Sequence, residues 1–402
     1  MAGRWQRLLQ EESEHQWLSI GVFFVFILIG AFAIGATEHF VGAQVMDTDA
    51  NYEGGLVTDI AYHPASQTYT ALVYSPDAGY SLFTEDMSED TTMGIYSPET
   101  NDQGANVQFL KAMPDGEVLF STSQNQVIGL QGDLMITYDY TTVNGVFGVM
   151  DVAERTNEDT THRLLLTKEG SETSVRGIVG MTPTPAMSTS LGVQWHHIEA
   201  YNQTHWIAIG THISTAGADG SSPATPQSRP VLGWIEWNGG EGTPVIDKVQ
   251  TFDGGMFHSI AKNSNTIVIG GTVHSLLIHT PERVETLDVA CARVVADTSG
   301  KVWFIGQLGS STLTTYHDGE VNIYVLGQSM PVEQSAVGAS GDYVHVHGVD
   351  VNGEPIQWSI DITANGSIES GRGFLNLLYL MVGSVLLAMM LRYAVSELKQ
   401  PV

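Results

Sequence analysis

The sequence contains a single cysteine, Cys291, in 402 residues. One cysteine cannot form an internal disulfide or supply the several thiolates of a structural zinc or iron–sulfur site. Basic residues are also scarce, with 16 Lys and Arg against 44 Asp and Glu, and the formal net charge is -28. Because no basic stripe is available to displace counterions from phosphates, the composition argues against a nucleic-acid partner.

Known catalytic motifs are also absent. The chain has no Gly-x-Ser-x-Gly elbow, no His-Glu-x-x-His helix and no phosphate-binding glycine loop. A triad assembled in space from distant residues leaves no such local motif, so an enzyme stays open as an alternative.

Two long apolar runs lie near the ends of the chain. Residues 17–36 carry no charge over a length that, at about 1.5 Å per residue, matches a hydrocarbon core. A second run occupies residues 373–392. Both predict transmembrane helices. A cleaved signal peptide is the alternative for the first run, but its apolar stretch is longer than such peptides usually have.

Basic residues near the membrane ends predict the orientation, because Lys and Arg are retained on the cytoplasmic side. Arg4 and Arg7 precede the first run, and Arg392 and Lys399 lie at the end of the second run and beyond it. We therefore expect cytoplasmic tails at 1–16 and 393–402. Residues 37–372 would form an extracytoplasmic domain that carries the whole acidic excess.

The segment 37–372 contains an internal repeat. A small residue, a run of turn-type or polar residues and an apolar strand recur seven times, at intervals averaging about 45 residues. The small residues are Ala65, Ala112, Ala153, Ala200, Ala261, Ala296 and Gly338. Further strands can be placed after most copies, and four short strands every 40 to 50 residues are typical of a β-propeller blade. We predict an all-β, seven-bladed propeller flanked by the two transmembrane helices.

Two segments carry a resemblance to a known group. Residues 296–306 and 112–121 resemble the blade motifs of the WD40-like and quinoprotein-like propellers. The resemblance implies the fold and no particular activity. The chain departs from both groups, since it lacks any Trp-Asp dipeptide and the adjacent cysteines usual in quinoprotein dehydrogenases.

Ring closure would bring the chain ends together. The first and last strands of a propeller meet, so both membrane segments would leave from one edge of the disc. We expect the strand Phe40–Val45 to pair within the last blade.

Histidines form the first group of candidate ligands. His345 and His347 alternate with valines and so share one face of a strand, a spacing that suits Zn²⁺ or copper. The alternative is a hydrogen-bonded pair packed between blades. A second cluster, His196 and His197 with His205 and His212, has the same two interpretations.

Oxygen ligands form the second group. Asp47, Asp49 and Asn51 are spaced like the start of a calcium loop, but the glycine and the final acid of such a loop are missing. Ca²⁺ is therefore an alternative to a solvated acidic linker. No cofactor is predicted otherwise.

Surface features complete the set. The Ser-, Pro-, Ala- and Gly-rich stretch from Ser214 to Pro230, with Asp219 and Arg229, is predicted to be a binding loop. Asn202 and Asn365 begin N-glycosylation sequons.

These features predict a membrane-anchored propeller outside the cytoplasm that binds a protein, peptide or glycan as a scaffold or assembly module. Two alternatives remain. One is a propeller hydrolase or lyase with histidines and carboxylates at the central channel. The other is an accessory subunit of a larger membrane complex.

Overall fold

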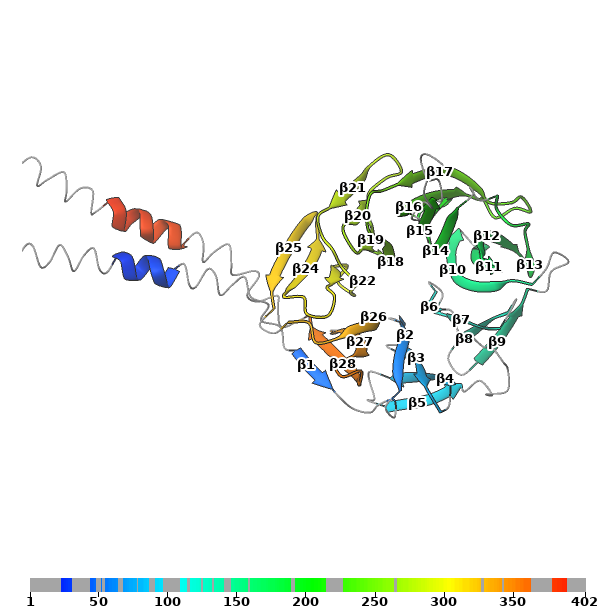
Figure 1. Ribbon diagram of the computed structural model, residues 1–402, viewed down its shortest axis with the longest axis horizontal. Helices are drawn as coiled ribbons and strands as arrows, with labels where there is room; N and C mark the ends of the chain where they lie inside the picture. Colours follow the sequence, from blue (N-terminus) through cyan, green and yellow to red (C-terminus); the bar gives the residue numbers. More distant parts are fainter. Residues whose placement is uncertain are drawn as a thin grey trace, which may run out of the picture. The chain divides into compact units, whose positions relative to one another are not determined.

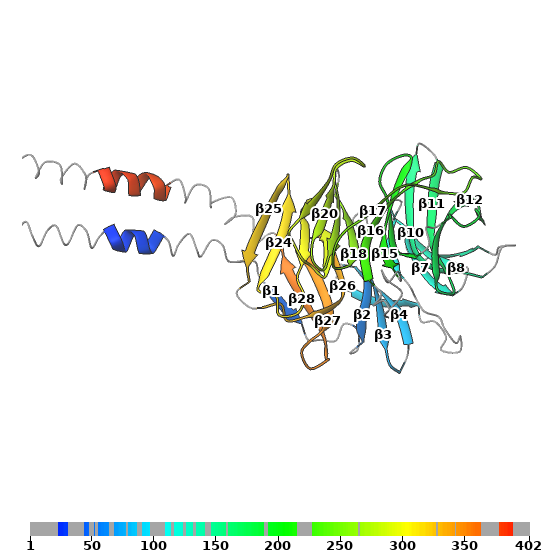
Figure 2. The ribbon, with the colours of Figure 1, turned by 45° about the horizontal axis from the view of Figure 1, so that its top comes forward.

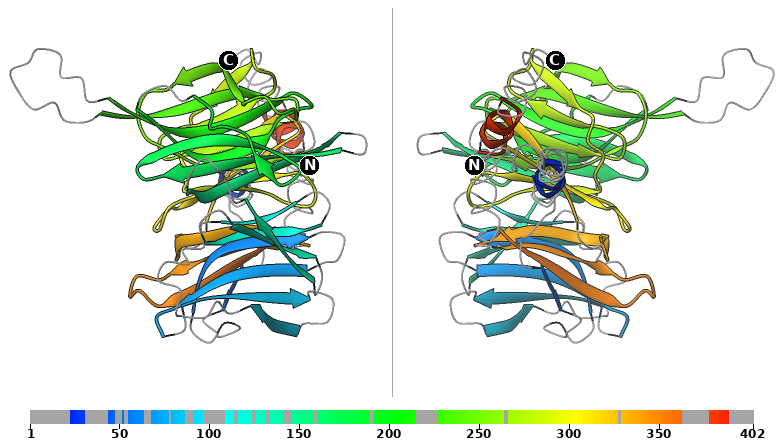
Figure 3. Two further views of the ribbon diagram at one scale, coloured as in Figure 1. Left: turned by 90° about the vertical axis from the view of Figure 1, so that its right-hand side faces the viewer. Right: turned by 90° about the vertical axis from the view of Figure 1, so that its left-hand side faces the viewer.

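Seven four-stranded sheets surround a common axis in the computed structural model (Figure 1). The structure describes residues 23–30, 44–47, 52, 55–63, 68–77, 79–86, 91–96, 109–113, 116–123, 126–131, 134–140, 146–157, 160–188, 192–214, 227–263, 266–326, 329–341, 343–362 and 378–388. The predicted seven-bladed propeller is therefore confirmed. Figures 2 and 3 show the twist of the individual sheets as the ring is turned.

The blades follow one another in chain order, and the strands of each blade are named from the axis outward. Blade 1 is β2 (Leu56–His63), β3 (Thr68–Ser75), β4 (Gly79–Asp86) and β5 (Thr91–Tyr96); blade 2 is β6 (Leu110–Ala112), β7 (Val118–Ser123), β8 (Gln126–Gln131) and β9 (Leu134–Asp139); blade 3 is β10 (Gly148–Asn157), β11 (Thr160–Glu169), β12 (Glu172–Val179) and β13 (Thr182–Pro183). Blade 4 is β14 (Val193–Ala200), β15 (His205–Ser214), β16 (Gln227–Glu236) and β17 (Val245–Thr251); blade 5 is β18 (Phe257–Lys262), β19 (Ile267–Gly271), β20 (Ser275–Ile278) and β21 (Val284–Leu287). Blade 6 is β22 (Arg293–Ala296), β23 (Val302–Ile305), β24 (Thr312–His317) and β25 (Glu320–Val325); blade 7 is β26 (Glu333–Ser340), β27 (Tyr343–Val349), β28 (Pro355–Asp361) and β1 (Gln44–Asp47).

The repeat found in the sequence is the hairpin between the first two strands of a blade. Ala112 ends β6 and pairs with Val118 of β7, and Ala296 of β22 pairs with Val302 of β23 in the same way. A small side chain at the end of the inner strand thus precedes each of these tight turns. Ala65 lies outside the described residues.

The hydrophobic core lies between the blades. One cluster joins blades 3 and 4 through side chains such as Leu164, Trp195 and Trp206, which have no exposed surface. Equivalent clusters join other neighbouring sheets. Each fully buried Leu or Ile contributes about 1.5–3 kcal/mol relative to exposure, so packing of blade on blade stabilises the ring.

A glycine in the second strand accommodates the backbone of the first strand in blade 4. A Cβ atom on Gly210 would lie 2.2 Å from the main-chain oxygen of Gln194. Gly210 pairs with Trp195 immediately before a β-bulge, where β14 bends toward its neighbour. Only a residue without a side chain fits there.

The ring closes within blade 7. Strand β1 pairs antiparallel with β28, with Gln44 opposite Ile360 and Asp47 opposite Gln357. The predicted closing strand is confirmed in its blade, where it is described from Gln44 to Asp47. Of the predicted range Phe40–Val45, residues 40–43 lie outside the described part of the chain. The first and last strands of the propeller are therefore neighbours.

The flanking segments form a separate compact unit. Helices are described at residues 23–30 and 378–388, within the two predicted spans. They contact each other: the rings of Phe26 and Tyr379 stack at 5.2 Å, and the Tyr379 hydroxyl donates to the carbonyl of Ile27 at 3.3 Å. No helix in the described residues has both the length and the apolar character needed to cross a membrane.

Candidate functional site: the axial cavity

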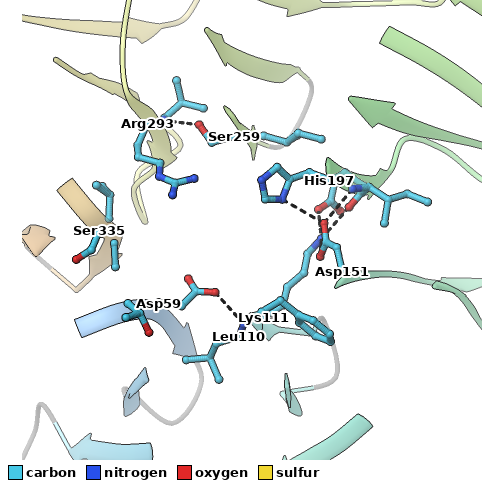
Figure 4. A pocket seen from close by; sticks show the side chains of 16 residues that line it. Asp59, Leu110, Lys111, Asp151, His197, Ser259, Arg293 and Ser335 are labelled. Atoms are coloured by element: carbon cyan, nitrogen blue, oxygen red, sulfur yellow. Dashed lines mark hydrogen bonds and ion pairs between the residues drawn. The ribbon is translucent and has the colours of Figure 1, made fainter. Parts of the chain in front are cut away.

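A cavity of about 340 Å³ lies on the axis of the ring, where the inner strands of all seven blades meet (Figure 4). Each blade contributes at least one polar or charged side chain. The polar lining residues are Thr58, Asp59, Lys111, Asp151, His197, Glu199, Ser259, Arg293 and Ser335. A second cavity of about 320 Å³ shares Leu110, Lys111 and Val337 with the first.

β-Bulges in the inner strands direct these side chains toward the axis. The pairing shifts between Val57 and Asp59 in β2, and between Val149 and Asp151 in β10. The same shift occurs at the level of the cavity in β14, β18 and β26. Because a bulge inserts one residue and reorients the next, it can aim a polar side chain at a site that regular alternation would leave apolar.

Lys111 connects three blades. Its Nζ lies 3.0 Å from Glu199 Oε2 and 3.4 Å from Asp151 Oδ1, and it donates to the carbonyl of Ile198 at 2.9 Å. Burial alone would lower the pKa of Lys111, but the two carboxylates outweigh burial and raise it. Burial would likewise raise the pKa of Asp151, but the charges of Lys111 and His197 lower it. Lys111 and Asp151 are therefore both ionised at neutral pH.

Asp59 has a different environment. Its carboxylate accepts hydrogen bonds from the main-chain N–H groups of Leu110 at 2.8 Å and Ile60 at 2.9 Å. Burial raises the pKa of Asp59 to about 6, although these two bonds and the charges of Arg293 and His197 oppose the rise. The structure gives Asp59 no ion pair with any described residue.

Three of these polar side chains form hydrogen bonds between neighbouring blades. Asp59 accepts from Leu110 N of blade 2, and Asp151 accepts from Ile198 N of blade 4 at 2.9 Å. Ser259 makes the equivalent bond to Val294 N of blade 6 at 2.9 Å. A buried main-chain N–H without a partner is costly, so part of the polar lining serves the architecture.

Arg293 faces the cavity, and the described residues occupy few of its donors. Its Nη1 donates to the carbonyl of His258 at 3.2 Å, and the guanidinium points toward the axis in Figure 4. Among the described residues it makes no ion pair. Burial, Arg293 and His197 lower the pKa of His258, so the imidazole adds no second cation beside the guanidinium.

The predicted pair His345 and His347 lies on one face of β27, with ring centroids 6.3 Å apart. His347 Nε2 is 2.7 Å from the Tyr69 hydroxyl of blade 1, and His345 Nδ1 is 2.9 Å from Ser359 Oγ. Burial lowers the pKa of His345 to about 4 and that of His347 to about 3. The contact with Tyr69 matches the alternative of a pair packed between blades.

The described residues contain no group of three or more His, Cys, Asp or Glu side chains placed to hold a metal ion. Zinc or copper at the His345 pair stays a prediction, as does Ca²⁺ at the start of the propeller. Asp47 ends β1, and Asp49 and Asn51 lie outside the described residues.

The second histidine cluster is divided. His197 lines the axial cavity, with its Nδ1 3.5 Å from Asp151 Oδ2. His196 lies 3.0 Å from Thr211 Oγ1 within its own blade. His205, at the start of β15, contacts Thr204 Oγ1 at 2.8 Å. His212, on β15 opposite Val193, is not among the cavity residues. Of the four, His197 alone reaches the candidate site.

The predicted surface sites are partly described. Arg229 is exposed on β16, 3.7 Å from Asp253, and Ser214 ends β15, whereas Asp219 lies outside the described residues. Asn202 lies exposed in the turn after β14, where its Oδ1 accepts from Thr204 N at 2.9 Å. Asn365 lies outside the described part of the chain.

Most cavity residues were not singled out by sequence reasoning. Asp59, Asp151 and Ser259 each stand two residues before the alanine of their inner strand, and Arg293 stands three before Ala296. Aligning the repeats on their small residue and searching just before it for polar residues would have found Asp151, Ser259 and Arg293. It would have missed Asp59, because the repeat in blade 1 was aligned on Ala65 and not on Ala61.

Neither a family model nor a curated protein matches the sequence. Among solved structures, the chain is similar to the Cps50 (Swd1) β-propeller domain of Myceliophteria thermophila, with a TM-score of 0.52 and 10% identity over 76% of this chain and 97% of that chain. It is also similar to Raptor of Chaetomium thermophilum, with a TM-score of 0.53 and 8% identity over 80% of this chain and 29% of that chain. A puromycin-hydrolyzing peptidase of Mycobacterium tuberculosis matches with a TM-score of 0.51 and 11% identity over 76% of this chain and 51% of that chain. Identities this low show the fold alone, and they confirm the resemblance to WD40-like propellers.

Proposed function

We propose that the protein is a propeller tethered to the cell membrane by its two flanking apolar segments. The disc lies outside the cytoplasm and binds a protein, peptide or glycan partner as a scaffold or assembly module. The ring closure carries this proposal. Because Gln44 pairs with Ile360, the residues that lead to both apolar segments start from neighbouring points of blade 7.

Two further observations support a paired anchor. The helices at 23–30 and 378–388 pack on each other through Phe26 and Tyr379. A Cβ atom on Gly30 would lie 1.7 Å from Tyr379 Cε2, so the close approach depends on this glycine. Small residues allow apolar helices to associate within a bilayer, where the hydrophobic effect gives them no reason to do so.

The binding role is tested on the loop predicted from the sequence. The full-length chain is purified in mild detergent, and its partners are identified by mass spectrometry. Deleting residues 215–226 is expected to remove the main partner, and Arg229→Glu is expected to alter its binding, because charge at the rim of an interface steers association. Arg283→Glu, at another exposed turn, is the matched control. A partner retained in the deletion variant would assign binding to another surface, and a disc without any partner would contradict the scaffold role.

A hydrolase or lyase is the second candidate. The observation that favours it is Asp59, a carboxyl group with a pKa of about 6 in a cavity that also presents Arg293 and His197. Such a pKa lies near the range in which general acids and bases work. Turnover of a chromogenic ester or uronide that disappears in Asp59→Asn would establish this activity. The main-chain bonds of Asp59 and the ion pairs of Lys111 favour the binding role instead.

A further inference from the structure

The axial cavity has a distinctive balance of charge. Lys111 is paired with Asp151 and Glu199, and His197 faces Asp151. Two ionisable groups at the cavity, Arg293 and Asp59, have no ion pair with any described residue. The cavity therefore presents one unpaired cation and one unpaired carboxyl group, on blades 6 and 1.

We propose that the axial cavity binds a small zwitterion of the α-amino acid class, with its carboxylate on Arg293 and its ammonium group toward Asp59. This site is separate from the partner-binding surface of the disc.

Arg293 supports the carboxylate half of the proposal. A guanidinium presents a planar fork of N–H donors that matches a carboxylate, and the bond from Nη1 to His258 O leaves other donors available. A charge at a cavity wall without a counter-ion is costly, and a ligand anion would remove that cost.

Asp59 supports the ammonium half. Its carboxylate faces the same cavity from β2, and the charge of Arg293 acts on it. With Lys111 already offset by two carboxylates, a doubly charged anion such as phosphate would meet net repulsion, whereas a zwitterion is neutral overall. The volume of about 340 Å³ accommodates a molecule of amino-acid size and lies at the lower end of ordinary ligand pockets.

Acidification provides an independent readout. The charged groups that face Asp59 are Lys111, Asp151, His197, Glu199 and Arg293. Because the pKa of Asp59 is about 6, most of this carboxyl group is protonated at pH 5 and cannot attract an ammonium group. The apparent affinity scales with the fraction of molecules in which Asp59 is ionised. Binding of the amino acid should therefore be roughly tenfold weaker at pH 5 than at pH 7.5.

The experiment measures binding of the twenty protein amino acids to the full-length chain in detergent by calorimetry. Three probes with the same branched carbon chain are compared. L-Valine carries both charged groups, isovalerate carries the carboxylate alone, and isobutylamine carries the ammonium group alone. We expect an amino acid to bind and each half-ligand of its type to bind at least about tenfold more weakly, since charge-assisted hydrogen bonds are lost. The proposal of a zwitterionic ligand would be overturned if isovalerate or phosphate bound as tightly as valine. It would also be overturned if none of the twenty amino acids bound.

Variants extend the test. Arg293→Gln is expected to weaken binding by roughly 10- to 100-fold, and Arg293→Lys by less, because it keeps the charge but loses the fork. Arg283→Gln, in the exposed turn between β20 and β21, is the control. Equal affinities in Arg293→Gln and Arg283→Gln would contradict the proposal. The half-ligand comparison uses the unmodified protein and so stands even if a variant fails to fold. Because Arg293→Gln should keep its protein partner, loss of ligand and loss of scaffold function are distinguishable.

Discussion

Lys111→Ala is expected to destabilise the propeller by about 3 kcal/mol, since removal of one partner leaves buried carboxylates uncompensated. Asp151 would keep only its main-chain bonds and the contact with His197, and Glu199 would lose its cation. The expected loss is at the low end for broken buried pairs because the Lys111 side chain keeps 26% of its surface exposed. Thermal unfolding followed by tryptophan fluorescence measures the loss, since Trp195, Trp206, Trp234, Trp303 and Trp358 are fully buried.

The control for this variant is Lys248→Ala. Lys248 is exposed and donates to the carbonyl of Pro281 at 2.9 Å, so its loss should change stability by less than about 0.5 kcal/mol. Adding Glu199→Gln to Lys111→Ala should recover part of the stability, because it removes one of the uncompensated charges. Equal destabilisation by the two lysine substitutions would show that the link between blades 2, 3 and 4 has no special role.

Acid is expected to weaken the closing blade through His345 and His347. The folded-state pKa values, about 4 and about 3, lie below the ordinary value of 6.5. Both imidazoles therefore take up protons below about pH 6.5 in the unfolded chain, but only near pH 3–4 in the folded chain. Because the unfolded state binds more protons between these values, the free energy of unfolding falls as the pH decreases through this window. The loss from His347 amounts to about 3 to 5 kcal/mol, at roughly 1.36 kcal/mol per unit of pKa.

His347→Gln tests this account, because glutamine retains an acceptor for the Tyr69 hydroxyl but does not titrate. His345 still titrates in this variant, so the free energy of unfolding should lose about half of the pH dependence that the two histidines give it between pH 6.5 and 4. Asp59 acts in the opposite direction, since its raised pKa costs stability at neutral pH that acid restores, but it contributes equally to both proteins. His317→Gln, at a side chain that is 40% exposed, is the control. If His347→Gln leaves the pH dependence of the free energy of unfolding unchanged, the low pKa given to buried His347 is contradicted.

The sequence was sufficient to predict the blade count because each hairpin is a local feature. The small residue, the turn and the buried second strand recur within a dozen residues, as in Ala296 to Val302, and tertiary context does not change them. The alternation of Tyr343, His345 and His347 likewise predicts one face, and their rings do face the same side of β27.

The axial cavity could not be predicted in the same way. Lys111, Asp151 and Glu199 lie in different repeats, and only closure of the ring brings them together. The bulges that aim Asp59 and Asp151 inward also break the two-residue alternation on which strand arguments depend. The end of the closing strand was also missed: it continues past Val45 to Asp47, because its bounds depend on pairing with β28, which lies at the other end of the propeller sequence.

Site-specific cysteine labelling in intact cells tests the central claim, a disc held outside the membrane. The native Cys291 is buried, and burial raises the pKa of its thiol to about 11, so it should react little with a maleimide that cannot cross membranes. Val351, 79% exposed in the turn between β27 and β28, is changed to cysteine in one variant, and Ala2 in another. The account predicts that Val351→Cys is labelled in intact cells and Ala2→Cys only after lysis. Labelling of Val351→Cys only after lysis would contradict it.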